Sequence, residues 1–144
     1  MDEVSPRVFI SDLKSANDGT LLRKNNIKCI ISLGCSVEIS VYDEACIDRA
    51  LCLQFPLLLD APEEIIVDVL LFAAAHIQRV LSPSNSFGNS SGSVLVHCVY
   101  GQSRSASVIM WHMISSRMLP FFIKVLSVSV VNTPATNTKI LYLL

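Results

Sequence analysis

Residues 94–106 read VLVHCVYGQSRSA, and this stretch decides the interpretation of the whole chain. It opens with Val94–Val96, a short apolar run that predicts a buried strand, and continues as the glycine-containing segment Cys98–Arg104. From Ser105 onward, apolar residues recur at helical spacing. A strand, a tight loop and a helix in this order can bind an anion, because loop N–H groups converge on one point and the helix N-terminus is partly positive. The stretch therefore predicts a phosphate-binding loop.

Three residue types in this loop indicate what would happen to a bound phosphate. Gly101 allows a backbone conformation that larger residues resist, and Arg104 carries a planar guanidinium that can bind two phosphate oxygens at once. The same positive field favours the thiolate of Cys98, which is the nucleophilic form of cysteine. Attack on phosphorus would give a phosphocysteine intermediate that water hydrolyses, with no metal or cofactor required. The alternative, that Cys98 is only a small buried apolar residue, leaves the fixed offsets of the other residues unexplained.

The loop resembles the active-site motif of a known superfamily. Cys-x5-Arg followed by Ser is typical of the protein tyrosine phosphatases, and the form found here is similar to the dual-specificity branch. The resemblance implies that Cys98 is the nucleophile, that Arg104 binds phosphate and the transition state, and that Ser105 hydrogen-bonds the sulfur. It also implies that His97 orients the loop and helps to keep the thiol ionised. The phosphate loop would consist of Cys98, Val99, Tyr100, Gly101, Gln102, Ser103 and Arg104.

A phosphate ester also needs a proton on its leaving oxygen, which a carboxylic acid can supply. The dual-specificity pattern places an aspartate after an apolar stretch, about forty residues before the cysteine. Residues 55–62 read FPLLLDAP and match that pattern, so the resemblance implies that Asp60 is the general acid. An alternative is that Asp60 caps a helix that begins near Pro62, since aspartate is a preferred N-cap residue. The two roles are compatible.

Strands and helices alternate along the rest of the chain. Helical spacing is clearest from Pro62 to Leu81, where Glu63 and Glu64 suit the first turn and His76 falls among apolar residues as a structural histidine. Further strands are expected at 7–13 and 29–33, and further helices at 21–26 and 105–117, while residues 52–59 form a second apolar stretch broken by Pro56. This order predicts an α/β fold, and with the resemblance it predicts a protein tyrosine phosphatase-like domain with a central, mostly parallel sheet flanked by helices. One domain would span residues 1–144, although 119–144 match the family poorly.

Composition limits the partners. The formal net charge is −1, so no global basic field points to nucleic acid, and the apolar run Met118–Val131 is too short for a membrane span. The first residues do not resemble a signal peptide, and the five cysteines include no Cys-x-x-Cys pair, so zinc is not expected. These features favour reduced thiols in a cytoplasmic protein, with the nucleus as a second location, and a monomer that acts on phosphoproteins.

The function predicted from these residues is hydrolysis of phosphotyrosine and of phosphoserine or phosphothreonine in proteins. A phosphoinositide or RNA 5′-phosphate phosphatase of the same superfamily is an alternative, but Val99, Tyr100 and Gln102 supply no lysine for a multiply charged substrate. An inactive phosphate-binding module is a third possibility, which the intact cysteine, arginine and aspartate argue against. Three features depart from the family pattern: Tyr100 at the loop rim, the long loop 84–92 and the tail 119–144.

Overall fold

The computed structural model describes residues 1–61, 64–82 and 92–131, with the backbone alone described for 118–131. Strands and helices alternate along these residues, as the sequence predicts. In chain order the elements are β1 (Asp2–Ser5), β2 (Val8–Ser11), α1 (Leu13–Ala16), α2 (Gly19–Lys24), β3 (Ile27–Leu33), α3 (Ile39–Ala45), the 3-10 helix η1 (Arg49–Leu51), β4 (Leu53–Phe55), α4 (Val67–Leu81), β5 (Ser93–His97) and α5 (Arg104–Val131).

The described strands form one sheet in the order β1-β2-β5-β3-β4. Strand β1 is antiparallel to β2, and every other neighbouring pair is parallel. All five residues of β5 are buried, which explains why its central part is a continuous apolar run. Because β5 lies between β2 and β3, the loop after His97 emerges at the middle of the sheet's carboxyl edge. Ligands of open α/β sheets bind at that edge.

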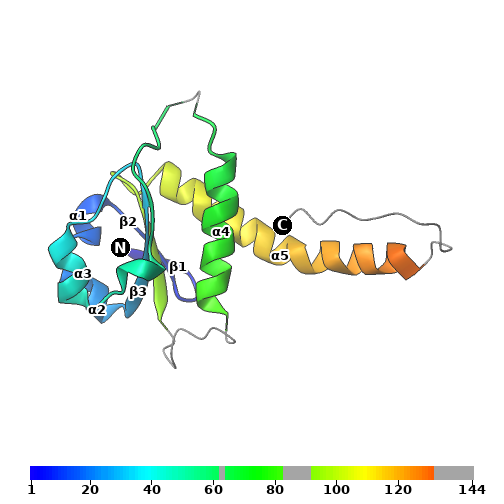
Figure 1. The fold of residues 1–144 in the computed structure, drawn as a ribbon, viewed down its shortest axis with the longest axis horizontal. Coiled ribbons are helices and arrows are strands. Elements are labelled where there is room, and N and C mark those ends of the chain that lie inside the picture. The colour runs from blue at the N-terminus through cyan, green and yellow to red at the C-terminus, as the bar shows by residue number, and fades with distance from the viewer. Residues whose placement is uncertain (62–63, 83–91, 132–144) are drawn as a thin grey trace.

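Helices cover both faces of the sheet. Figure 1 shows α1, α2 and α3 on one side and α4 and α5 on the other. Alternate side chains of β3 divide between the two layers: Ile31 and Leu33 join the core under α4 and α5, and Ile30 joins the core under the shorter helices. The predicted fold class, a central and mostly parallel sheet flanked by helices, is confirmed.

The start of α4 differs from the sequence prediction. The helix begins at Val67 rather than near Pro62, and its first turn carries Asp68 in place of Glu63 or Glu64. Before it, the Glu64 N–H donates to the Ala61 carbonyl in a turn outside the helix, and a residue before proline is disfavoured in the α conformation. Asp60 is therefore not the N-cap of this helix, because Ile66 occupies that position.

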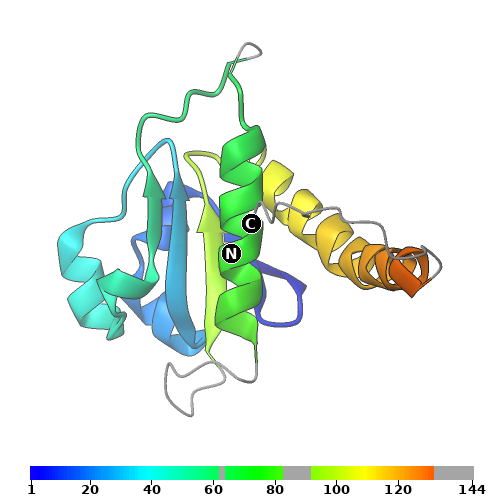
Figure 2. The same ribbon diagram turned by 45° about the vertical axis from the view of Figure 1, so that its right-hand side comes forward.

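Helix α5 is longer than the sequence predicts. It begins at Arg104 and continues without interruption to Val131, past the expected end at Arg117 and through Pro120. β-Branched residues lower helix propensity by only a fraction of a kcal/mol each, which is a weak constraint on where a helix ends. Figure 2 shows the later turns of α5 projecting away from the sheet.

Some predictions concern residues outside the described part. These are the first-turn positions Pro62 and Glu63, the loop before β5 up to Ser91, and the tail from Asn132. Within the described residues, no helix is both long enough and apolar enough to cross a membrane.

Candidate active site

The loop between β5 and α5 has the predicted strand–loop–helix form. Cys98 follows the last residue of β5, and Arg104 opens α5. Gly101 has a φ of +71°, and a Cβ atom there would lie 2.8 Å from the carbonyl group of Ser11, so glycine is required by conformation and by space. The Leu13 N–H donates to the Val99 carbonyl at 3.2 Å, which ties the loop to the start of α1. The loop thus packs against the end of β2 and is hydrogen-bonded to the start of α1.

The sulfur of Cys98 is buried among hydrogen-bond donors. It accepts the Gly101 N–H at 3.2 Å and lies 3.3 Å from the Ser105 hydroxyl, with 1% of the residue exposed. Burial by itself raises the thiol pKa, but the Ser105 hydroxyl and the backbone N–H groups of Ser105, Gly101 and Tyr100 outweigh it and lower the pKa to about 7. A large fraction of Cys98 is therefore thiolate at neutral pH.

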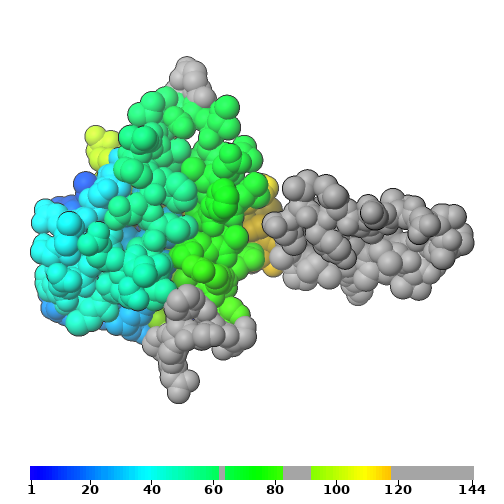
Figure 3. Space-filling model, viewed as in Figure 1, coloured from blue at the N-terminus to red at the C-terminus, as the bar shows by residue number. Residues whose placement is uncertain are grey.

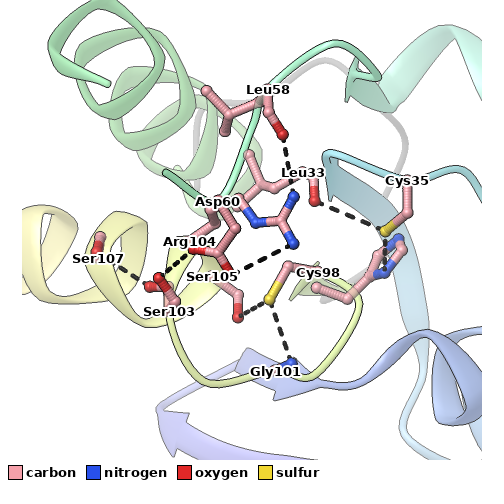
Figure 4. Close-up of polar contacts among 11 residues, drawn as sticks. Leu33, Cys35, Leu58, Asp60, Cys98, Gly101, Ser103, Arg104, Ser105 and Ser107 are labelled. Atoms are coloured by element: carbon pink, nitrogen blue, oxygen red, sulfur yellow. Dashed lines mark hydrogen bonds and ion pairs between the residues drawn. The ribbon is translucent and has the colours of Figure 1, made fainter. Parts of the chain in front are cut away.

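Arg104 crosses over the loop as a buried cation (Figure 4). Its Nη1 donates to the Leu58 carbonyl at 3.0 Å, and its Nη2 lies 3.6 Å from Oδ2 of Asp60. Its Nε is buried and has no hydrogen-bond partner among the described residues. A buried donor left unpaired costs roughly 1–3 kcal/mol, so an oxygen of a bound anion would be stabilised at this nitrogen.

Gly34 makes room for this arginine, and sequence reasoning missed its role. Gly34 follows β3 with a φ of +69°, and a Cβ there would lie 1.8 Å from Nη1 of Arg104 and 2.4 Å from the Leu58 carbonyl oxygen. No side chain larger than hydrogen fits beside the guanidinium. The only signal in the sequence is a glycine at the end of a buried strand, which without the strand order does not identify its neighbour.

Asp60 reaches the loop from the segment after β4. The Ser103 hydroxyl donates to its Oδ1 at 2.7 Å, and Arg104 holds the other oxygen, while 43% of the Asp60 side chain stays exposed. The structure therefore brings Asp60, Ser103 and Arg104 together at the mouth of the loop. The carboxyl group can be reached by solvent and lies next to the Arg104 guanidinium.

His97 lies beneath the loop and is fully buried. Its Nε2 is 2.8 Å from the Ser32 hydroxyl and its Nδ1 is 3.7 Å from the Cys35 sulfur. Burial lowers the His97 pKa to about 4, so the ring is neutral at pH 7 and its contacts fix the position of the strand end without adding charge. Ser32 and Cys35, like Gly34, carry no recognisable sequence signal.

The side chains of the remaining loop residues differ in exposure. Tyr100 is 74% exposed and forms part of the rim, and Gln102 is also exposed, whereas Val99 is half-buried. The Ser107 hydroxyl donates to the Ser103 carbonyl at 3.0 Å in the first turn of α5. Of the variable loop residues, Tyr100 and Gln102 therefore face solvent, and Val99 is partly covered.

Comparison with known proteins gives a consistent class. No family model and no curated protein sequence matches the chain. Among solved structures it is similar to DUSP15, at 27% identity and a TM-score of 0.59 over 76% of this chain and 61% of that one. It is also similar to human DUSP28, at 18% identity and a TM-score of 0.64 over 81% of this chain and 73% of that one. The Cydia pomonella PTP-2 phosphatase gives 18% identity and a TM-score of 0.64 over 81% and 70%.

The fold is therefore that of the protein tyrosine phosphatases and dual-specificity phosphatases. Within this class the chain is similar to the small atypical dual-specificity phosphatases, as its loop motif predicts.

Proposed function

We propose that the chain is a protein phosphatase that hydrolyses phosphotyrosine, and phosphoserine or phosphothreonine, through a phosphocysteine intermediate on Cys98. The observation that carries the proposal is the loop itself. A buried sulfur accepts a loop N–H at 3.2 Å, and the Nε of a buried arginine beside it has no partner among the described residues. Similarity to DUSP15, a protein named as a dual-specificity phosphatase, supports the same chemistry.

The first step transfers the phosphoryl group to sulfur. The Cys98 thiolate attacks phosphorus, the bond from phosphorus to the ester oxygen breaks, and protonated Asp60 gives its proton to that oxygen. Arg104 and the loop N–H groups stabilise the charge on the non-bridging oxygens. A bound phosphate would take over the hydrogen-bonding capacity of Arg104 that Asp60 now shares.

The second step releases inorganic phosphate. Water attacks phosphorus, the phosphorus–sulfur bond breaks, and the Asp60 carboxylate accepts a proton from the water. The Ser105 hydroxyl lies 3.3 Å from the departing sulfur, where it can donate a hydrogen bond to the thiolate as it forms. The short distances from Ser105 to the Cys98 sulfur and from Arg104 to Asp60 support the use of these groups in both steps.

The experiment compares matched phosphotyrosine and phosphothreonine peptides with a phosphoinositide and an RNA 5′-triphosphate. We expect phosphate release from the peptides, and none from any substrate with Cys98→Ser, which should still bind inorganic phosphate. Turnover of the lipid or the RNA, without turnover of the peptides, would make that compound the substrate class in place of phosphoproteins. Binding without turnover by the folded wild-type chain would identify an inactive phosphate-binding module.

A further inference from the structure

Two other cysteines meet on the far part of the sheet. Cys29 lies in the first half of β3, and Cys52 lies between η1 and β4. Because β3 and β4 are parallel, this pair lies toward their amino ends, whereas the loop with Cys98 lies at the carboxyl edge. Figure 3 shows the surface above this region, where the teal atoms around β4 meet the green atoms of α4.

The sulfur of Cys52 takes the place of a backbone acceptor. The Ile30 N–H of β3 donates to it at 3.3 Å, just before the β3–β4 pairing begins at Ile31 and Leu53. The contact with the Cys29 thiol, followed by this N–H, lowers the Cys52 pKa against the opposing effect of burial. The Ile30 N–H thus favours the thiolate of Cys52, whose thiol form can instead donate to the Asp48 carbonyl at 3.6 Å.

Cys29 has the opposite environment. It is fully buried, and its thiol donates to the Leu51 carbonyl at 3.0 Å. The contact with Cys52, together with burial, raises the pKa of Cys29, so Cys52 is the more readily ionised of the two thiols. Each sulfur lies within hydrogen-bonding distance of the residue next to its partner, Cys52 at the Ile30 N–H and Cys29 at the Leu51 carbonyl.

His76 and Arg79 of α4 close the inner side of the pair. Arg79 donates to Nδ1 of His76 at 2.9 Å, which leaves the hydrogen of the neutral ring on Nε2. That Nε2–H donates to the Leu51 carbonyl at 2.8 Å and lies 3.5 Å from the Cys29 sulfur. Burial, with the nearby Arg79 charge, lowers the His76 pKa, which keeps the ring neutral. The predicted structural role of His76 matches these contacts.

The outer side of the pair is open through Cys52 alone. A surface hollow of about 460 Å³ is lined by Cys52 together with Tyr42, Arg49, Ala50 and Gln54. The Arg49 guanidinium lies 5.7 Å from the centre of the Tyr42 ring and brings positive charge to this hollow, while Asp48 brings negative charge. A small oxidant can reach Cys52 but has no direct access to Cys29.

We propose that Cys52 and Cys29 form a peroxide-sensitive dithiol in which Cys52 is oxidised first and Cys29 resolves the product into a disulfide. The Cys52 thiolate attacks hydrogen peroxide, the oxygen–oxygen bond breaks, and Cys52 sulfenic acid and hydroxide form. The Cys29 sulfur then attacks the Cys52 sulfur, the sulfur–oxygen bond breaks, and the released hydroxide takes the Cys29 proton to leave as water. Two thiol sulfurs are oxidised and one peroxide is reduced. This inference does not depend on the proposed phosphatase activity.

The test exposes the full chain to a slight excess of hydrogen peroxide, blocks free thiols with iodoacetamide and maps unreduced peptides by mass spectrometry. Trypsin with a glutamate-specific protease separates Cys46 from the peptide that carries Cys29 and Cys35, and fragmentation distinguishes those two. We expect a peptide joined to Cys52 through Cys29, which dithiothreitol separates. The same link should form in Cys98→Ser, where the loop sulfur is absent.

Two controls separate chemistry from access. Cys46 is exposed and Cys52 is half-buried, so access alone would let Cys46 react first. We expect Cys52 to react several-fold faster than Cys46 with iodoacetamide at mildly acidic pH. Cys29→Ser keeps a donor for the Leu51 carbonyl but removes the resolving sulfur, so Cys52 sulfenic acid should accumulate and be labelled by dimedone.

Three results would overturn the proposal. They are oxidation of Cys46 ahead of Cys52, a Cys52 disulfide to any other cysteine, and a Cys52 that stays reduced while Cys98 is oxidised. If Cys29→Ser does not fold, the peptide map and the two alkylation rates of the wild-type chain still decide between these outcomes.

Discussion

Cys98 lies at the carboxyl edge of the sheet and Cys52 lies toward the amino end of β4, and hydrogen bonding lowers the pKa of both thiols. Each sulfur accepts a backbone N–H, from Gly101 at 3.2 Å or from Ile30 at 3.3 Å, and each has a polar side chain beside it. That side chain differs, because Cys98 has the Ser105 hydroxyl and Cys52 has the Cys29 thiol. A hydroxyl cannot form a disulfide, whereas a thiol can. The comparison teaches that hydrogen bonds make a thiolate, and that its neighbours decide which reaction follows.

The arginine near each sulfur differs most between the two sites, because Arg104 crosses the loop at Cys98 and Arg49 lines the hollow at Cys52. We expect Arg104→Lys to have the largest effect on turnover. Lysine keeps the charge but loses the fork that contacts two oxygens, so we expect kcat on a phosphotyrosine peptide to fall roughly 10²–10³-fold. The measurement is steady-state kinetics, with the peroxide-driven loss of Cys52 followed in parallel and expected to stay unchanged.

Arg49→Lys is the matched control, because Arg49 lines the hollow at Cys52 and does not contact the loop in the structure. It should leave kcat unchanged. An equal loss of turnover in the two variants would mean that the effect of Arg104→Lys does not come from the lost guanidinium contacts at the loop, and would remove the distinction between the two sites.

Asp60→Asn tests whether the candidate active site contains a general acid, a group that the Cys29–Cys52 pair lacks. Asparagine can still accept from Ser103 but cannot give a proton, so we expect turnover of an alkyl phosphate ester to fall about 10²-fold. An aryl phosphate with a strongly acidic leaving group should be affected much less. Kinetics on a leaving-group series measures this, and a uniform loss along the series would assign Asp60 to binding only.

His97 lies beneath the loop with Cys98, and His76 lies beside Cys29. Because His97 is buried and neutral, acid should destabilise the fold by protonating its ring. Its folded-state pKa of about 4 lies below the ordinary 6.5, so its contribution to stability is present above pH 6.5 and is lost as pH falls toward 4. We expect a loss of roughly 2 kcal/mol in the free energy of unfolding between pH 7 and 4.5, from denaturant titrations.

His97→Gln should lose less stability over the same range, because glutamine does not titrate. His76 and His112 also have pKa values lowered by burial and contribute to the acid sensitivity of both proteins. Identical pH slopes for wild type and variant would show that His97 is as accessible to protons as in the unfolded chain.

The sequence predicts what is local and contiguous. The loop with Cys98 and Arg104 could be located because a strand, a glycine turn and a helix start follow one another within 94–106. The mostly parallel sheet follows from the alternation of elements. Asp60 could be assigned to the site only through the family pattern, since its contact with Ser103 joins two segments far apart in the chain.

The parts that sequence reasoning missed depend on strand order and register. Gly34 and the Leu58 carbonyl meet Arg104 only because β3, β4 and β5 end at the same edge of the sheet. Cys52 comes near Cys29 because the β3–β4 pairing, which begins at Ile31 and Leu53, brings Cys52 to Ile30, the neighbour of Cys29, and irregular cysteine spacing gives no sign of it. The predicted start of α4 was wrong because Pro62, Glu63 and Glu64 are residue types typical of a first helical turn, whereas the helix begins at Val67.

Ser105→Ala makes the smallest change and tests the effect of hydrogen bonding on the Cys98 pKa directly. Among the hydrogen bonds that lower the Cys98 pKa, that from the Ser105 hydroxyl is the strongest, so its removal should move this pKa upward from about 7. At pH values below this pKa the thiolate fraction of Cys98 then falls, and at pH values well above the pKa it is unchanged. We expect Cys98 alkylation by iodoacetamide to slow a few-fold at pH 6 and not at pH 9.

Cys29→Ala should likewise slow the alkylation of Cys52 at pH 6 and leave Cys98 unaffected. If either variant shifts the profile of the other cysteine, the two sulfurs belong to one coupled system rather than to two separate sites.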